Sequence, residues 1–388
     1  MRSRWKKAKR RHHKRSRTHH NSASPPTNSL YKPLPSESSI RLITLHPGNF
    51  KDPIRCTLEV FELDSVPSYE AISYVWGDPT PRNRIRCNSM RYLIGDNLYD
   101  ALRNVRLEDK PRVIWVDALC VNQANLGERS HQILLMRKIY SQARRTLICL
   151  DIKPCIDRNE DHWTSIAYQA LLKIVEWSER NSLPPRFRGL ESEKPQMLSL
   201  ESRHQVALNR LFSCKWFCRV WIIQETVLSP ESVFIVDGEE WRWYPLGAAS
   251  CRILEYFTAI YETNIDTSTI ASLLQANQMW LLIVEREEGT IVTLSTSMIR
   301  FQFALATEPR DLIYGLLAMS KEQPLLEQQM SSGSNGPIPL PNYEDTLIQV
   351  FTDWTRYFIE SSETLDVLSE TLVRGKGSPD SLDFVPHG

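Results

Sequence analysis

The chain has 388 residues, of which 41% are hydrophobic and 24% charged, and its formal net charge is +1. These values are ordinary for a soluble globular protein of one or two domains with a substantial core. The sequence contains no run of about 18 apolar residues, which excludes a membrane-spanning helix from the expected elements.

The N-terminal tail is strongly basic. Met1–His20 contains ten Lys and Arg, four His and no acid, so the remaining residues carry a net −9. Residues 1–38 are polar and rich in Pro and Ser, which predicts a disordered tail. Two further interpretations stay open. Lys6–Arg11 is dense enough in positive charge for a nuclear localisation signal, and the tail can attract RNA or acidic lipid by charge alone.

The cysteine pattern argues against a metal site. Eight cysteines occur, none in a Cys-x-x-Cys pair, and the Cys214–Cys218 spacing has no matching pair and no nearby His. The tail also lacks the apolar core of a secretory signal. The expectation is therefore a cytoplasmic or nuclear protein with reduced thiols and no bound metal.

The first third of the chain predicts mainly strands. Alternating or short apolar runs, separated by turn residues, indicate strands at Ile40–Leu45, Ile54–Leu63 and Glu70–Val75, then a hairpin at Arg84–Ile94 and a short helix at Leu98–Arg106. The turn Trp76-Gly77-Asp78-Pro79 ends the third strand.

A strand–helix–strand unit follows. Val113–Val116 reads as a buried strand and Thr146–Leu150 as another. Between them lies the helix Asn125–Ala143, which begins with a capping-box-like pair of Asn125 and Glu128. This order predicts a parallel βαβ unit, with Glu70–Val75 as a third parallel strand in the same sheet.

Helices dominate the rest of the chain. Helical spacing indicates segments at Ser165–Trp177, His204–Phe212, Val220–Leu228, Leu246–Tyr261, Ile270–Val284, Arg310–Met319 and Tyr343–Ile359, with one further strand at Ser232–Val236. Asn181–Pro195 and Ser331–Pro341 read as a surface loop and a linker.

Polar residues gather where the strand Val113–Val116 ends. Asp117, Cys120, Asn122 and Gln123 follow it directly, and ligands of open α/β sheets bind at the carboxyl ends of strands. Local capping of a strand-to-helix turn is the alternative interpretation. A nucleophilic role for Cys120 is disfavoured, because no His lies in the other two Trp-containing blocks described next.

Three Trp-containing blocks carry a family resemblance. They are Tyr69-Glu70-Ala71-Ile72-Ser73-Tyr74-Val75-Trp76-Gly77-Asp78, Ile114-Trp115-Val116-Asp117-Ala118-Leu119-Cys120-Val121-Asn122-Gln123 and Trp216-Phe217-Cys218-Arg219-Val220-Trp221-Ile222-Ile223-Gln224-Glu225. In this order they resemble the heterokaryon incompatibility (HET) domain of filamentous fungi. The resemblance covers Tyr69–Glu225 and continues weakly to Tyr314.

The HET domain in turn resembles the TIR signalling domain. This implies an α/β fold with a TIR-like, flavodoxin-like parallel sheet flanked by helices, followed by a mainly helical C-terminal extension. The implied organisation is a disordered basic tail at 1–38, a HET domain at 39–240 and the extension at 241–388. Many members of the family continue well beyond this point, so this extension resembles a C-terminal region that is either short or truncated.

The TIR resemblance also implies a site. In enzymatic TIR domains a Glu four residues after a Trp is essential for cleaving the nicotinamide–ribose bond of NAD, and Trp221 and Glu225 have this spacing. Glu225 is thus the implied catalytic residue, since a carboxylate can stabilise the positive charge that develops on the ribose. The implied NAD-contacting residues are Ser73, Tyr74, Trp76, Asp117, Arg129 and Trp221. NAD would be a substrate, and no permanently bound cofactor is expected.

Structural interpretations of the same residues stay open. Glu225 can pair with Arg219, the indole of Trp221 can belong to the core, and Arg129 can pair with Glu128 or Asp117. In the downstream block Glu308–Tyr314, we expect an ion pair between Arg310 and Asp311. Where the family often has Leu-Gly after its third strand, this chain has Leu150-Asp151, which weakens the case for a nucleotide pocket at that edge.

Two functions follow from the resemblance. One is an effector of fungal nonself recognition that triggers programmed cell death by NAD cleavage. The other is a non-catalytic TIR-like module that signals by assembly. Both imply self-association or other signalling proteins as partners, with nucleic acid contacted only through the basic tail.

Overall fold

The computed structural model describes residues 30–78, 80–152, 163–181, 200–236, 238–255, 267–333 and 336–362. The chain divides into two units, residues 1–33 and 34–388, and every helix and strand among the described residues belongs to the second. Most of the predicted basic tail, including the Lys6–Arg11 segment, lies outside the described residues.

The N-terminal elements are β1 (Ser39–Leu45), β2 (Arg55–Glu62), the 3-10 helix η1 (Leu63–Ser65), β3 (Glu70–Tyr74), β4 (Asn83–Cys87), β5 (Met90–Ile94), α1 (Asp96–Val105), β6 (Arg112–Trp115), α2 (Asp117–Cys120), α3 (Leu126–Gln142) and β7 (Thr146–Cys149). The later elements are α4 (Trp163–Asn181), α5 (Ser202–Phe212), η3 (Lys215–Cys218), α6 (Trp221–Val227), β8 (Ser232–Val236), β9 (Glu239–Arg242), α7 (Trp243–Glu255), α9 (Thr267–Glu287), α10 (Leu294–Arg300), α11 (Asp311–Leu317), α12 (Glu322–Ser332) and α13 (Leu347–Ser362).

The strands form one mixed sheet in the order β5-β4-β2-β1-β6-β3-β7-β8-β9. Its centre, β6-β3-β7-β8, is parallel. The prediction that the three apolar strands at Glu70–Val75, Val113–Val116 and Thr146–Leu150 are parallel neighbours is therefore confirmed.

The sheet as a whole is mixed, whereas the TIR resemblance implied a parallel sheet. β1 pairs antiparallel with both β2 and β6, and β9 pairs antiparallel with β8. A short connection allows the antiparallel pairing of β1 with β2 and of β8 with β9. β1 and β6 are far apart in the sequence, so their pairing depends on tertiary contacts. The predicted hairpin is present as β4 and β5, joined through Asn88 and Ser89, whose φ angles of 50° and 66° are those of a tight hairpin turn.

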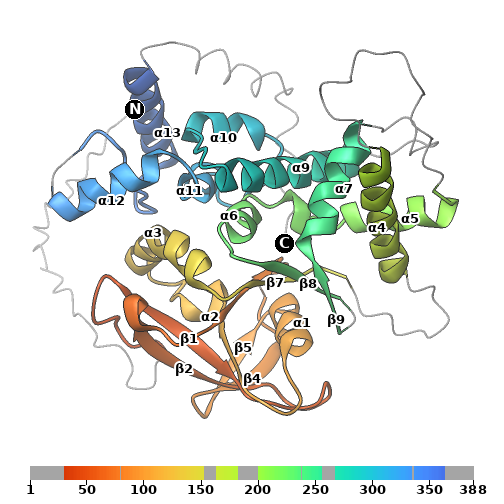
Figure 1. Ribbon diagram of the computed structural model, residues 1–388. Coiled ribbons are helices and arrows are strands. Elements are labelled where there is room, and N and C mark those ends of the chain that lie inside the picture. The colour runs from red at the N-terminus through yellow and green to blue at the C-terminus, as the bar shows by residue number, and fades with distance from the viewer. Residues whose placement is uncertain are drawn as a thin grey trace, which may run out of the picture. The chain divides into compact units, whose positions relative to one another are not determined.

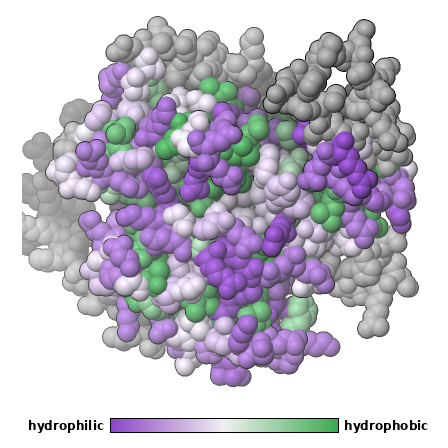
Figure 2. All heavy atoms as spheres, in the orientation of Figure 1, coloured by the Kyte–Doolittle hydropathy of each residue, from purple (hydrophilic) through white to green (hydrophobic). Residues whose placement is uncertain are grey.

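Helices cover both faces of the parallel centre. Figure 1 shows α1 on one side of the sheet, and α3 and α6 on the other. The five residues of β3 are accordingly all buried, as expected for a parallel strand with both faces covered. Of the helices that follow β9, α9 and α11 pack against α6. None of the described helices is long and apolar enough to cross a membrane. On the face seen in Figure 2, hydrophobic groups are scattered among hydrophilic ones.

The buried strand β3 begins with a charged residue, Glu70, that is held by two arginines. One Glu70 carboxylate oxygen lies 2.9 Å from Arg112 Nε and the other lies 2.7 Å from Arg145 Nε. Arg145 also pairs with Glu240 of β9 at 2.6 Å. These ion pairs join the starts of β3, β6 and β7 at one edge of the sheet.

We expect Glu70→Gln to lower the free energy of unfolding by roughly 3 kcal/mol or more, because removing one partner of a buried ion pair leaves uncompensated charge. Urea denaturation measures this. The matched control is Glu176→Gln, which removes the exposed ion pair with Arg180 on α4 and should leave the midpoint almost unchanged. Equal effects of the two variants would contradict a special role for Glu70.

Candidate functional site

The carboxyl group of Glu225 meets β3 at Ser73. The Ser73 hydroxyl donates a short hydrogen bond to Glu225 Oε2, and the indole Nε1 of Trp216 donates to Ser73 Oγ at 2.8 Å. All three side chains are buried, and Glu225 is only 3% exposed. The backbone of Glu225 is fixed as well, since its carbonyl accepts from Thr146 Oγ1 of β7 at 3.0 Å. The structure therefore brings Ser73 and Glu225, two of the implied site residues, into direct contact.

Burial changes the acidity of Glu225. The pKa of Glu225 is raised to about 7, mainly by loss of hydration on burial and also by the nearby carboxylate of Asp117, whereas Arg219 and the hydrogen bond from Ser73 act in the opposite direction. Near neutral pH the group therefore exists in both protonation states. A carboxyl with this pKa can donate or accept a proton under physiological conditions.

Asp117 stands at the end of β6, where α2 begins. Its Oδ1 accepts from the backbone N–H of Ala118 at 2.7 Å, and its Oδ2 accepts from Trp76 Nε1 at 2.8 Å. Burial raises its pKa, and Arg219 opposes this shift. Asp117 is the first residue of α2, whose N-cap is Val116 without a side-chain cap, so among backbone N–H groups its carboxylate bonds only the adjacent one and does not cap the helix. It also holds Trp76, whose side chain stays 43% exposed.

Arg219 links the two carboxyl groups. It lies just before α6, donates a short hydrogen bond to the carbonyl of Tyr74, and its charge lowers the pKa of both Glu225 and Asp117. From the sequence, Arg219 was expected only as an ion-pair partner of Glu225. The available signal was that Arg219 is the only basic residue between Trp216 and Leu228.

Tyr74 is buried and neighbours Ser73 on β3. Successive side chains of a strand alternate between faces, so Tyr74 and Ser73 point to opposite sides of the sheet. Burial raises the pKa of the Tyr74 phenol well above its usual value. The Tyr74 group that takes part in the site is its backbone carbonyl, which accepts the hydrogen bond from Arg219. This carbonyl lies at the carboxyl end of β3, the edge of the sheet where Trp76 and Asp117 are bonded to each other.

The side chains of Trp221 and Arg129 contact Asp311 rather than Glu225. Trp221 Nε1 donates to Asp311 Oδ2 at 2.9 Å, and Arg129 Nη2 lies 3.8 Å from Asp311 Oδ1. Although Trp221 and Glu225 share α6, the indole reaches α11 and the carboxyl reaches β3. Arg129 acts on Asp117 only through its charge, which lowers the Asp117 pKa.

The expected ion pair between Arg310 and Asp311 is wrong. The Arg310 guanidinium reaches back to Glu308, with Nε 2.8 Å from Oε1, and also donates to the carbonyls of Tyr343 and Asp345. Asp311 instead accepts from Trp221 and from the hydroxyl of Tyr343. The partners of Asp311 are thus distant in sequence, whereas Arg310 forms its ion pair with Glu308, two residues before it.

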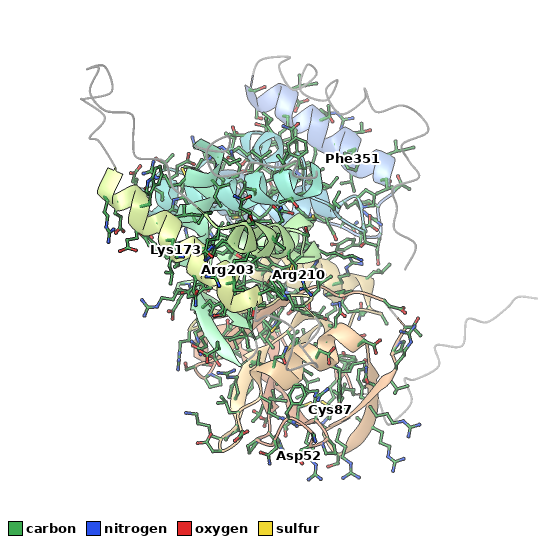
Figure 3. The ribbon with its side chains drawn as sticks, turned by 90° about the vertical axis from the view of Figure 1, so that its right-hand side faces the viewer. Asp52, Cys87, Lys173, Arg203, Arg210 and Phe351 are labelled. Carbon is green, nitrogen blue, oxygen red and sulfur yellow. The ribbon has the colours of Figure 1, made fainter. Side chains whose placement is uncertain are left out.

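The surroundings of Glu225 are closed. The two hollows found over the described residues lie away from it. One is lined by residues of α13, including Phe351, which is labelled in Figure 3. The other is lined by Arg103 and Arg106, near the end of α1, and by Val236 at the end of β8. Within the described ranges, no group of His, Cys, Asp or Glu is arranged to hold a metal ion. Burial raises the pKa of the Cys120 thiol to about 12, so this thiol stays protonated at neutral pH.

The fold and site define an α/β protein with buried carboxyl groups at the carboxyl ends of its parallel strands, and the comparisons with known proteins show what it is similar to. Residues 69–225 match the family described as heterokaryon incompatibility protein (HET). This region of the chain, which is less than half of its length, therefore resembles a HET domain.

A relative supports this assignment. The chain is 27% identical over 365 residues to "Heterokaryon incompatibility protein 6, OR allele" of Neurospora crassa. The match covers 83% of this chain and 52% of the relative, so the chain spans about half the length of that protein. No solved structure matches the chain.

The raised pKa of Glu225 predicts a pH-dependent stability. The carboxyl takes up a proton more readily in the folded state, with a pKa of about 7 against a usual 4.5, so its contribution to stability is present at low pH and is lost as pH rises to 7. Between pH 4.5 and 8 the wild type should lose roughly 3 kcal/mol relative to Glu225→Gln, which keeps an acceptor for Ser73.

Urea denaturation of both proteins across this pH range provides the measurement. The difference between them isolates Glu225 from Asp117 and Asp311, whose pKa values are also raised. Parallel pH profiles would contradict a raised Glu225 pKa.

Proposed function

We propose that this chain acts in fungal heterokaryon incompatibility, as an effector of nonself recognition that triggers programmed cell death. The HET domain at residues 69–225 and the similarity to a protein named for heterokaryon incompatibility support this role. The proposed partners are further copies of the chain or other signalling proteins.

We further propose that the α/β part is TIR-like. The supporting observation is the strand order at the centre of the sheet. In chain order β3, β6, β7 and β8 are its first four parallel strands, and they lie side by side as β6-β3-β7-β8. This is the 2-1-3-4 order of flavodoxin-like folds, in which ligands bind at the carboxyl ends of the strands where the order reverses. Ser73 and Tyr74 end β3 at that point.

The proposed chemistry is cleavage of the nicotinamide–ribose bond of NAD, with Glu225 as the catalytic group. The observation that carries it is a buried carboxyl with a pKa of about 7 at the end of the central strand, with Ser73 and Arg219 beside it. In its charged form this carboxyl can oppose the positive charge that develops on the ribose. Trp76, held by Asp117 and 43% exposed, offers an aromatic face to a base.

The second candidate is a non-catalytic module that signals by assembly. The closed surroundings favour it, because Glu225 is 3% exposed and neither hollow lies beside it. NAD cleavage therefore requires a rearrangement that opens the site, which assembly of several copies can drive. The two candidates share one biology and differ in whether Glu225 performs chemistry.

The direct test is NAD consumption by purified protein at concentrations that allow assembly, together with killing when the gene is expressed in a fungal host. If Glu225 is catalytic, Glu225→Gln should stay folded and lose both activities, by at least about 100-fold in NAD turnover. Glu285→Gln serves as the matched control, since it breaks an ion pair between α9 and Arg300 of α10. A folded Glu225→Gln protein that still kills would favour the assembly module.

The proposed localisation is cytoplasmic, with a nuclear address in the basic tail as the alternative. A fluorescent reporter fused to Met1–His20 measures this separately from the fold. The ten basic residues predict nuclear accumulation, and neutralising Lys6, Lys7, Lys9, Arg10 and Arg11 should abolish it. An evenly distributed reporter would remove the nuclear proposal.

A further inference from the structure

The N-terminal end of α6 is held by residues that lie beyond the matched HET region. Leu305 forms two backbone hydrogen bonds with the segment before α6, from Val220 N to Leu305 O at 3.0 Å and from Leu305 N to Cys218 O at 2.6 Å. Gln275 Nε2 of α9 donates to the carbonyl of Arg219 at 2.9 Å. Figure 1 shows α6 between the sheet and the helices that follow β9.

The first residue of α6 is fixed through its side chain as well. The Asp311 cluster consists of Arg129, Trp221, Asp311 and Tyr343. Asp311 accepts from Trp221 Nε1 at 2.9 Å and from the hydroxyl of Tyr343 at 2.5 Å, and it is 6% exposed. The Arg129 guanidinium stacks on the Tyr343 ring at 3.7 Å and lies 3.8 Å from Asp311. The cluster thus joins α3, α6, α11 and the segment before α13.

The same end of α6 packs closely on α11. A Cβ atom at Gly315 would lie 3.1 Å from Val220 Cγ2 and 3.7 Å from Trp221 Cδ2, so only glycine leaves the present spacing undisturbed. Backbone bonds, a charged hydrogen-bonded cluster and close packing therefore all fix the start of the helix that carries Glu225. Glu225 stands one turn further along, where its carboxyl meets Ser73.

We propose that Asp311, supported by Tyr343 and Arg129, is a positioning residue for Glu225. Together with Gln275 and Leu305, Asp311 completes from outside the matched region 69–225 the support of the helix that carries this carboxyl. Asp311 acts through Trp221 and the orientation of α6 and has no contact with Glu225 itself. As a role in catalysis, this inference rests on the proposed NAD cleavage. As a statement about what holds α6, it stands without that function.

The test measures the helix and the chemistry separately in the full chain. Asp311→Asn removes the charge and one acceptor oxygen at nearly constant volume. Hydrogen exchange in a peptide covering residues 219–227 should become about tenfold faster, because a buried charge-assisted hydrogen bond is weakened. Exchange in β1 and β2 should not change. The control is Glu285→Gln, which breaks the Arg300 ion pair within the same helical layer and should leave α6 exchange unaltered.

The second readout is NAD cleavage by the same variants. A displaced Glu225 should lower kcat about 100-fold in Asp311→Asn with little change in KM, since Asp311 does not touch substrate. If Asp311→Asn does not fold, Tyr343→Phe replaces it. This variant keeps the ring under Arg129 and deletes only the hydroxyl bond to Asp311.

The outcomes separate the two proposals. Faster α6 exchange supports the positioning role even when the wild type fails to cleave NAD, a result that would remove the proposed chemistry alone. Exchange in α6 as slow as in the control overturns the positioning role. So does an active wild type whose Asp311→Asn variant cleaves NAD at the wild-type rate.

Discussion

The central strand β3 imposes the constraint on which the rest of this structure depends. It is buried along its whole length and yet carries Glu70 at its start and Ser73 near its end. A buried polar group that lacks a partner is costly, so each of these side chains must be satisfied by a neighbouring element. Glu70 recruits Arg112 and Arg145, whereas Ser73 recruits Trp216 and Glu225. The start of β3 is thus held by the ion pairs of Glu70, and its end forms part of the candidate site through Ser73.

The same constraint explains the unusual acidity of Glu225. The hydrogen bond with Ser73 places the Glu225 carboxyl in the protein interior, and this burial is the largest cause of its raised pKa. Arg219 limits this effect without forming the direct ion pair that would hold the carboxyl permanently ionised, because its guanidinium bonds the carbonyl of Tyr74. The result is a carboxyl that titrates near neutral pH inside a packed site. Chemistry at this group therefore depends on an opening step, which connects the proposed enzyme activity to assembly.

Local sequence signals were enough for the parallel centre of the sheet. Glu70–Val75, Val113–Val116 and Thr146–Leu150 were recognisable as short apolar runs, and the cap at Asn125 was recognisable from Glu128, whose N–H bonds Asn125 Oδ1 at 3.1 Å. The antiparallel strands at the sides of this centre were harder to predict, because the pairing of β1 with β6 depends on contacts between residues distant in sequence. The helix α12 escaped prediction because Pro324 suggests a break, although proline is tolerated in a first turn.

The candidate site was predictable only in part, for a similar reason. Family resemblance pointed to Ser73 and Glu225, which the structure brings together. It could not indicate that Trp221, on the same helix, turns toward Asp311, since that partner lies 90 residues away along the chain. The sequence indicated the role of Arg219 only weakly, through its position as the one basic residue in the mainly apolar block after Trp216.

The central claim, that Glu225 is a buried carboxyl titrating near neutrality, is tested most directly by carbon NMR of protein labelled at the glutamate carboxyl carbons. Comparison with Glu225→Gln assigns the resonance. We expect this resonance to move with a pKa of about 7, well above the usual 4.5 of an exposed glutamate. A resonance that titrates with the surface glutamates near 4.5 would contradict the claim.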